Sequence, residues 1–405
     1  MSFDWPIVRL ENVTSRIGDG LHGTPKYDDN GDYYFINGNN LSNGRIVINE
    51  KTKRTDKEQY LKHKKDINDR TLFVSINGTL GNIATYREEK IILGKSACYL
   101  NVLPEVDKDY IKYVLTSKHF QDYIHNLATG STIKNVGLKL IREYEFRLPE
   151  LAVQKEVSNI LNAIDFKIEN NTQTNQTLEQ MAQAIFKSWF VDFDPVKAKM
   201  NGEQPNGMDT ATASLFPEKL VESELGLIPE GWQVGKLSEL IKFANGKSGT
   251  KSDSGQFPLY GANGIIGFSE EAMFEDAVII GRVGAYCGAI EYCNSQFWAS
   301  DNTIVATAKG GKAQLPFVLY LLKFLDLNQH AGGAAQPLLN QKVLNSLEVP
   351  IPSNAVLEKY GELLATMLDK MTHNIEENHN LESLRETLLP KLLSGEIDLT
   401  SEVVE

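Results

Sequence analysis

Apolar side chains recur at heptad spacing along two long segments of this chain, residues 148–190 and 351–393. The steps between them alternate between three and four residues, a pattern typical of a helix that packs along its length against another helix. The second segment repeats the first 203 positions later without a gap. About 40 residues at about 1.5 Å each predict two helices of about 60 Å, and only another helix of this length could cover such a face.

We therefore expect the two helices to form an antiparallel coiled coil, whose seam contains two asparagines at matching positions in each copy. Buried amides there would fix the register of the pair at a cost in stability; alternatively, the asparagines lie beside the seam in a polar patch. Pro390 predicts a kink in the last turn, and Gly395 predicts the helix end. The seam is assigned to Ile160, Ile164, Ile168, Asn171, Asn175, Leu178, Ile185, Leu363, Met367, Met371, Asn374, Asn378, Leu381 and Leu388.

A globular segment precedes each long helix, and in both segments short β-rich runs alternate with Gly and Asn turns. The first segment predicts strands at 33–36, 45–48 and 72–76 and one helix at 109–126. The second repeats this order, with a strand at 277–281 and a helix at 315–327. The predicted fold class is α+β, with two pseudo-repeated mixed α/β domains separated by two long antiparallel coiled-coil helices.

This organisation predicts six consecutive segments. The stretch between the copies is acidic and rich in turn residues, and we expect it only to connect them. The segments are a first domain (1–147), a first long helix (148–193), an acidic linker (194–231), a second domain (232–350), a second long helix (351–395) and an acidic tail (396–405).

The formal net charge of −12 at pH 7 argues at first against a nucleic-acid partner. However, the acidity lies mostly outside the globular segments: residues 1–149 contain 22 Lys and Arg against 19 Asp and Glu, and residues 232–353 contain 9 against 10. One stretch is openly basic and is either a solvated face or a phosphate-contacting patch. It contains Lys51, Lys53, Arg54, Lys57, Lys62, Lys64 and Lys65.

Neither membrane insertion nor metal binding is expected. No apolar run approaches the roughly 18 residues that span a bilayer, and the first residues lack the features of a signal peptide, so we expect a cytoplasmic protein. Cys98, Cys287 and Cys293 form no C-x-x-C pair, which predicts reduced packing residues.

Motifs that would carry catalysis are also missing. Residues 245–248 (Asn-Gly-Lys-Ser) resemble the end of a phosphate loop, but Ile241 occupies the place of its first glycine. The sequence contains no G-x-S-x-G elbow, no H-E-x-x-H and no dinucleotide-binding glycine motif after a strand. We expect a binding protein with no catalytic residues.

Several short motifs occur in a duplicated order, with proline pairs leading into the helices. They are Phe35–Leu41, Ser75–Gly81, Leu148-Pro149, Gly281–Tyr286, Ile351-Pro352 and Leu388–Ile397. Together with the paired helices, this order resembles the specificity subunit of Type I restriction-modification systems along essentially the whole chain. The second copy departs from the pattern by lacking a counterpart of Gln154-Lys155 after its proline pair.

The resemblance implies a non-catalytic subunit that reads a bipartite target in double-stranded DNA, each domain reading one half and the helices setting an unspecific spacer. The implied partners are two methyltransferase subunits, which methylate adenine N6, and restriction subunits, which are translocating endonucleases. S-adenosylmethionine, ATP and Mg are expected on those partners, and no cofactor is expected on this chain.

For DNA contacts we select polar residues of the strand-exit turns and of the approach to each long helix, because Arg and Lys read guanine whereas Asn and Gln read adenine. They are Lys26, Arg45, Asn77, Gly78, Thr79, Lys134, Lys139, Lys247, Arg282, Gly284, Tyr286, Gln336, Asn340 and Lys342.

Two other functions compete with this interpretation. A coiled-coil adaptor with two heads that bind non-DNA ligands would explain the acidity more simply, but not two near-neutral heads on long paired helices. A stand-alone nuclease or methyltransferase is disfavoured by the missing cofactor and metal motifs. Affinity for random duplex DNA at low salt would separate the DNA-binding function from the adaptor.

Overall fold

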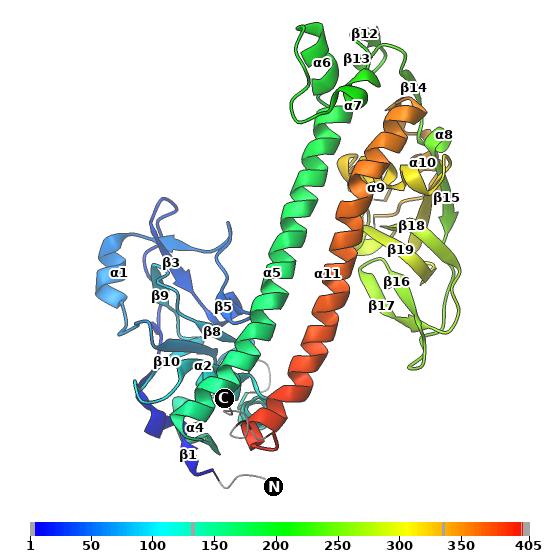
Figure 1. Cartoon of the computed structure of the whole chain (residues 1–405). Helices are drawn as coiled ribbons and strands as arrows, with labels where there is room; N and C mark the ends of the chain where they lie inside the picture. Colours follow the sequence, from blue (N-terminus) through cyan, green and yellow to red (C-terminus); the bar gives the residue numbers. More distant parts are fainter. Residues whose placement is uncertain (1–4, 131–133, 334–336, 398, 400–405) are drawn as a thin grey trace, which may run out of the picture. The chain divides into compact units, whose positions relative to one another are not determined.

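The computed structural model of the chain describes residues 5–130, 134–333, 337–397 and 399. It contains two compact units: the first unit comprises residues 1–170 and 376–405, and the second unit comprises residues 171–375. Each unit holds one globular domain and about half of each long helix, α5 (Leu151–Phe190) and α11 (Asn354–Ser394) (Figure 1). The predicted α+β class, with two mixed domains and two long helices, is confirmed.

An antiparallel sheet in the order β2-β10-β7-β8 forms the centre of the first unit. Strands β7 and β10 are buried at every position because both faces of the sheet are covered. Leu72 and Val74 belong to the core that includes residues of the helices, whereas Phe73 packs against a second sheet, β6-β3-β9.

The bounds of the elements in the first unit are as follows. The strands are β1 (Ile7–Arg9), β2 (Thr14–Asp19), β3 (Tyr33–Ile36), β4 (Leu41–Ser42), β5 (Arg45–Ile46), β6 (Arg54–Thr55), β7 (Thr71–Ser75), β8 (Ile83–Thr85), β9 (Ile91–Leu93), β10 (Ala97–Val102) and β11 (Glu145–Arg147). The short helices are η1 (Leu10–Val13), η2 (Gly38–Asn40), α1 (Lys57–His63), α2 (Lys108–Thr116), α3 (Lys118–Leu127) and α4 (Leu138–Glu143).

The strands predicted at 33–36 and 72–76 correspond to β3 and β7, whereas the run at 45–48 is a strand only over its first two residues. The single helix predicted over 109–126 is wrong. Ser117 has an extended backbone and separates α2 from α3, and its hydroxyl accepts a hydrogen bond from the Phe120 amide. Because Ser117 caps the start of α3, the apolar spacing over 109–126 belongs to two consecutive helices and not to one.

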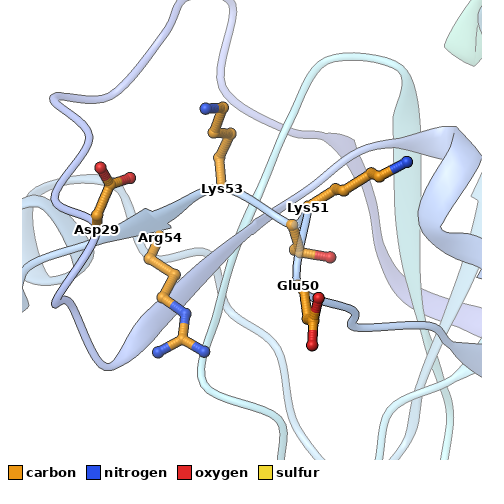
Figure 2. Close-up of a pocket in the computed structure, with 6 residues that line it drawn as sticks. Asp29, Glu50, Lys51, Lys53 and Arg54 are labelled. Atoms are coloured by element: carbon orange, nitrogen blue, oxygen red, sulfur yellow. The ribbon is translucent and has the colours of Figure 1, made fainter. Parts of the chain in front are cut away.

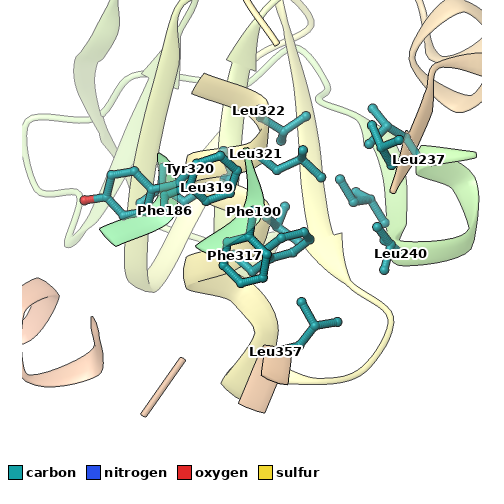
Figure 3. Packing of buried hydrophobic residues seen from close by; sticks show 14 of the residues in the cluster. Phe186, Phe190, Leu237, Leu240, Phe317, Leu319, Tyr320, Leu321, Leu322 and Leu357 are labelled. Carbon is teal, nitrogen blue, oxygen red and sulfur yellow. The ribbon is translucent and has the colours of Figure 1, made fainter. Parts of the chain in front are cut away.

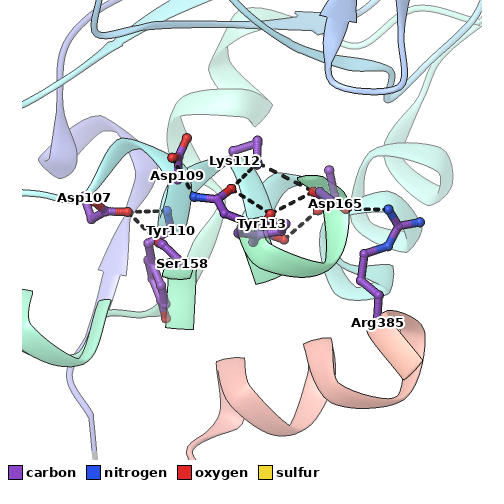
Figure 4. A network of polar contacts seen from close by, with 10 residues as sticks. Asp107, Asp109, Tyr110, Lys112, Tyr113, Ser158, Asp165 and Arg385 are labelled. Atoms are coloured by element: carbon purple, nitrogen blue, oxygen red, sulfur yellow. Dashed lines mark hydrogen bonds and ion pairs between the residues drawn. The ribbon is translucent and has the colours of Figure 1, made fainter. Parts of the chain in front are cut away.

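A polar network joins α2 to both long helices within the first unit (Figure 4). The Asp165 carboxylate on α5 accepts hydrogen bonds from the Tyr113 hydroxyl at 2.7 Å and from Arg385 Nη1 of α11 at 2.7 Å. Asn162 Oδ1, one turn before Asp165, accepts from Lys112 Nζ at 2.9 Å and lies 2.8 Å from the Tyr113 oxygen. Burial and the Asp165 carboxylate raise the pKa of Tyr113, so its phenol stays protonated as a donor.

The second unit contains a six-stranded sheet in the order β15-β20-β18-β19-β16-β17, covered on one face by α9. The strand predicted at 277–281 lies within β18, whereas the predicted helix 315–327 ends three residues early and continues as a 3-10 turn. Figure 3 shows the core of the second unit, in which Phe186 and Phe190 of α5 lie against Phe317 and Tyr320 of α9.

The elements of the second unit, apart from α5 and α11, have the following bounds. The strands are β12 (Leu220–Ser223), β13 (Gly226–Pro229), β14 (Gln233–Lys236), β15 (Ile241–Asn245), β16 (Phe257–Gly261), β17 (Gly264–Ser269), β18 (Phe274–Gly281), β19 (Ile290–Ala299), β20 (Thr303–Ala308) and β21 (Glu348–Ile351). The helices are α6 (Asp194–Met200), α7 (Thr210–Ser214), α8 (Leu237–Leu240), η3 (Gly284–Tyr286), η4 (Lys312–Gln314), α9 (Leu315–Phe324), η5 (Leu327–His330) and α10 (Gln341–Ser346).

Residues 194–231, expected only to connect the copies, are folded into the second unit. They form α6, α7 and the hairpin β12-β13. Val196, Phe216 and Ile228 belong to the buried core, and the Trp189 and Phe216 rings meet edge to face at 5.1 Å. The expectation was wrong because turn residues and acidic charge dominate this stretch, while the few apolar side chains that anchor it are widely spaced.

The two long helices run antiparallel within each unit. In the first unit, Lys167 of α5 pairs with Glu377 of α11 at 3.1 Å, and Asp165 pairs further along α11 with Arg385. In the second unit, Asn175 contacts Met371, and Phe186 contacts the earlier Tyr360. Within each unit, residues with higher numbers on α5 thus contact residues with lower numbers on α11, which is the antiparallel arrangement that was predicted.

The seam asparagines make equivalent bonds in the two units. In the second unit, Asn175 Nδ2 donates to the Met371 carbonyl at 3.0 Å; in the first, Asn378 Nδ2 donates to the Ile168 carbonyl at 3.4 Å. The 203-residue repeat relates Asn175 to Asn378 and Ile168 to Met371, so the two bonds occupy matching positions of the repeat. Asn374 is fully buried and donates to Asn175 Oδ1 at 2.7 Å. This supports the role of these amides in setting register rather than the alternative of a peripheral polar patch.

One predicted seam position is displaced. Leu363 is 42% exposed, whereas the neighbouring Leu364 is fully buried in the core of the second unit. The buried positions here are Tyr360, Leu364 and Leu368, at successive steps of four, because this face of α11 packs on the domain core as well as on α5. The remaining predicted seam residues are buried or half-buried. Helix α11 ends at Ser394, and Gly395 follows with a φ of +71°, as predicted for the stop.

Gly361 permits a close approach between α11 and the turn before α9. A Cβ atom at this position would lie 1.7 Å from the Ala313 carbonyl oxygen. Helix propensity alone predicts that Gly361→Ala stabilises the protein by about 1 kcal/mol. We instead expect a loss of about 1 to 2 kcal/mol in the free energy of unfolding, because the turn must shift to relieve the clash.

Denaturant unfolding of Gly361→Ala measures this effect. Ala365→Gly, at an exposed position one turn later, is the control and is expected to cost about 1 kcal/mol through propensity alone. A gain in stability for Gly361→Ala would show that α11 and the turn are not in contact.

Candidate nucleic-acid interface

The strand-exit turn of the first unit lies beside the loop that leads to α4. After β7 ends, Gly78 takes a φ of +77°, and its amide donates to the Lys134 carbonyl at 3.0 Å. The Val136 amide donates to the Ile76 carbonyl at 2.8 Å, and Asn77 Nδ2 donates to Asn135 Oδ1 at 3.2 Å. The structure therefore brings together the two groups of residues that were predicted separately, the turn and the approach to the helix.

The second unit builds the same arrangement from different residues. The Gly284 amide donates to the Pro337 carbonyl at 3.2 Å, and the Leu339 amide donates to the Arg282 carbonyl at 2.9 Å. Gly284 has a φ of +69°, so it matches Gly78 in conformation and in partner. In this register Arg282 corresponds to the buried Ile76 rather than to Asn77. The second turn thus places a guanidinium where the first has an apolar side chain.

The Arg282 side chain is half-buried, and its Nε atom is buried without a hydrogen-bond partner among the described residues. Its backbone is held from both sides, since the Arg282 amide donates to the Asn302 carbonyl at 3.0 Å and its carbonyl accepts from Leu339. Burial raises the pKa of the neighbouring Cys287 thiol, which donates to the Arg282 carbonyl. A protonated, buried thiol is a packing group and not a nucleophile.

Other predicted contact residues around these turns are exposed. Gly78, Thr79, Lys134 and Tyr286 lie at the surface of their turns and loops, and Lys139 is exposed on α4, where it pairs with Glu143. Lys342 is exposed on α10, just after Asn340. The Asn340 side chain caps α10 by accepting from the Val343 amide at 3.0 Å, which gives it a structural role. Gln336 lies outside the described residues.

Three predicted residues lie apart from the paired turn and loop. Arg45, on β5, forms an ion pair with Glu169 of α5, so its charge is engaged within the first unit. Lys26 is exposed, and its backbone amide donates to the Gln59 side chain at the start of α1. Lys247 is exposed after β15, and its carbonyl accepts from the Trp298 indole at 2.8 Å.

A basic surface of the first unit was recognised only in part from the sequence. Lys51, Lys53 and Arg54 line a depression of about 670 Å³ together with Thr52, Asp29 and Glu50 (Figure 2). Lys90, which is distant in sequence, lies over the Tyr33 ring through the β3-β9 pairing and is not among the residues that line the depression. The signal that could have found it is the pair Tyr33-Tyr34, because half-buried tyrosine rings can hold neighbouring cations in place.

The described part of the chain offers no group of three or more His, Cys, Asp or Glu side chains placed to hold a metal ion. The three cysteines are free and buried, as predicted, and burial raises the pKa of Cys98 to about 12. Among the helices in the described ranges, none combines the length and the apolar character that crossing a membrane requires.

Comparison with known proteins identifies the class to which this architecture belongs. The sequence pattern of the Type I restriction modification DNA specificity domain matches residues 4–180 and, a second time, residues 229–384. The chain therefore belongs to this family. The two matches correspond to the two copies of the internal repeat, and the resemblance inferred from the short motifs is confirmed.

Individual relatives agree with this assignment. The chain is 27% identical to the Type I restriction enzyme HindI specificity subunit of Haemophilus influenzae, over 73% of this chain and 78% of the relative. It is 22% identical to the MjaIX specificity subunit of Methanocaldococcus jannaschii, over 97% and 94%. The fold resembles the crystal structure of the Type-I restriction-modification system S subunit from M. genitalium, with a TM-score of 0.64, 22% identity and 96% coverage of each chain.

Proposed function

We propose that this chain is the specificity subunit of a Type I restriction-modification complex and that it recognises a bipartite sequence in double-stranded DNA. The observation that carries the proposal is the match of the DNA specificity domain to both copies of the repeat. The pairing of a strand-exit turn with a helix-approach loop in each unit supports it further, because each copy then presents one set of polar groups for one half of the target.

In this proposal the turns read base edges. Asn77 and Lys134 in the first unit, and Arg282 in the second, carry the side-chain types that form specific hydrogen bonds with adenine or guanine in the major groove. The backbone bonds at Gly78 and Gly284 fix each turn against its loop before DNA binds, which reduces the ordering cost on association.

The unspecific spacer between the two half-sites is assigned to the long helices. Helix α5 contains 40 residues and α11 contains 41, and each contributes residues to both units. At about 1.5 Å per residue such a helix is about 60 Å long. About 3.4 Å per base pair then gives somewhat less than two turns of duplex.

Chemistry is assigned to the partners, and this chain contributes no catalytic residue. Two methyltransferase subunits holding S-adenosylmethionine would flip and methylate adenines, while restriction subunits would use ATP and Mg. Exposed apolar side chains on the long helices support docking of partner helices. They are Phe166 and Leu384 in the first unit and Met181, Leu363 and Ile375 in the second.

Arg282→Ala tests the assignment of one half-site to one unit. Loss of a bidentate guanine contact costs about 1 to 3 kcal/mol. We therefore expect binding to one half of the target to weaken about tenfold or more, with the sequence preference at the other half intact. The measurement is the methylated motif in cells that carry the variant with its methyltransferase.

Asn77→Ala is the reciprocal variant and should relax only the opposite half. If Arg282→Ala weakened the sequence preference equally at both halves of the target, or changed it at neither half, Arg282 would not be a base-reading residue.

A further inference from the structure

The outer edge of the second sheet in the first unit is covered by cations that lie on tyrosine rings. This sheet has the order β6-β3-β9, so β6 is an edge strand. Arg54 lies 5.2 Å from the centroid of Tyr34, and Lys53 lies 5.8 Å from that of Tyr27. From the other side of β3, Lys90 lies 6.0 Å from the Tyr33 ring, which itself stacks on Tyr60 of α1. The cations are held in place by rings that do not neutralise their charge.

These cations are available to an external anion. Lys51, Lys53, Arg54 and Lys90 are exposed, and in the described part of the chain none of the four forms an ion pair within 4.0 Å. Further lysines along and after α1 are also exposed, namely Lys57, Lys62 and Lys64. Asp29 and Glu50 also line the depression between them, so the surface carries a surplus of positive charge and is not purely cationic (Figure 2).

The corresponding strand of the second unit has a different chemistry. In both units a parallel pair, β3-β9 or β16-β19, has a third, antiparallel strand on its outer edge. That strand is β6 in the first unit and β17 in the second. The exposed large side chains of β17 are apolar: Ile265, Ile266 and Phe268 are each between 40% and 52% exposed. The repeat thus presents several cations at one copy of this edge, whereas the other copy exposes apolar side chains beside one lysine, Lys251, whose side chain lies against Gly267.

We propose that the surface formed by Lys51, Lys53 and Arg54 binds backbone phosphates of the DNA duplex, and that the first unit therefore supplies most of the salt dependence of DNA binding. The inference rests on the proposed function. Each phosphate neutralised by Lys or Arg releases condensed counterions, which lowers the logarithm of the binding constant by about 0.9 per tenfold increase in salt. The corresponding edge of the second unit carries fewer cations, so we expect it to release fewer counterions.

The test compares two triple variants of the full chain with equal changes in charge. Lys51→Gln, Lys53→Gln and Arg54→Gln together remove three cations from the surface. Lys118→Gln, Lys155→Gln and Lys242→Gln together remove three exposed cations from α3, α5 and β15. Fluorescence anisotropy with a labelled duplex of random sequence gives the affinity over a series of salt concentrations, and thermal unfolding verifies that both variants remain folded.

We expect the salt slope of the first variant to be shallower than that of the wild type by about 2 to 3, with the control changed by less than about 1. An unchanged slope in the first variant, or an equal change in both, would overturn the phosphate surface while leaving the proposed function in place. Absence of duplex binding by the wild-type chain at low salt would overturn the proposed function itself.

Charged residues on an edge strand also prevent pairing with other chains. That role alone predicts that the first variant self-associates and retains the wild-type salt slope. Sedimentation of the same samples therefore separates edge protection from phosphate binding: a monodisperse variant with a shallower slope supports the proposal, and an aggregating variant with an unchanged slope contradicts it.

Discussion

Replacement of Phe186 by alanine is expected to lower the free energy of unfolding of the second unit by about 3 to 5 kcal/mol. Phe186 is 3% exposed, and its ring lies within 6.5 Å of five other aromatic rings, centroid to centroid. These rings come from α5, α9 and α11, so one truncation opens a cavity where three helices meet. Since surrounding aromatic rings cannot collapse into a space of this size, the expected cost lies at the high end for core substitutions.

Phe166→Ala is the matched control, because Phe166 lies on the same helix but is 70% exposed. Its expected cost is below about 0.5 kcal/mol. Tryptophan fluorescence during denaturant unfolding reports the second unit, in which Trp189 and Trp232 lie next to Phe190. Similar costs for the two variants would contradict the aromatic core described here.

The second large effect concerns the polar network of the first unit. Asp165→Ala is expected to cost about 2 to 3 kcal/mol, because it removes two hydrogen bonds to a carboxylate and leaves Arg385 without its partner. Lys112, whose Nζ lies 3.7 Å from Asp165, also loses a compensating charge, and burial already lowers the pKa of this lysine. The free energy of unfolding from denaturant titration measures the loss.

Glu156→Ala, at an exposed position of the same helix, controls for the loss of a carboxylate and should change stability by less than about 0.5 kcal/mol. A double-mutant cycle with Arg385→Ala should give a coupling energy of about 1 kcal/mol or more. Additive costs would show that Asp165 and Arg385 do not act on each other, and that the link between α5 and α11 in the first unit is made by other contacts.

The long helices could be predicted because heptad spacing is a local signal that survives over 40 residues. The failure at Leu363 shows its limit. A strict alternation of three and four assumes that a helix faces one partner, but in the second unit α11 also packs on the domain core, which moves burial to Leu364. Similarly, Phe216 and Ile228 are too far apart in sequence to signal that residues 194–231 belong to that core.

The candidate interface could be predicted as two separate sets of residues but not as one surface. Gly78 and Gly284 were identified as turn residues, yet their bonds to Lys134 and Pro337 join segments more than 50 residues apart. No local pattern carries that information. Lys90 illustrates the same difficulty, since it reaches the Tyr33 ring only through the parallel pairing of β9 with β3.

The measurement that tests the central claim most directly is a map of methylated adenines in host DNA, from cells that express the chain with its neighbouring methyltransferase and from cells that express the methyltransferase alone. The account predicts a motif with two fixed halves and an unspecific spacer, methylated only when this chain is present. Absence of modification, despite a purified complex of this chain with an active methyltransferase, would contradict it.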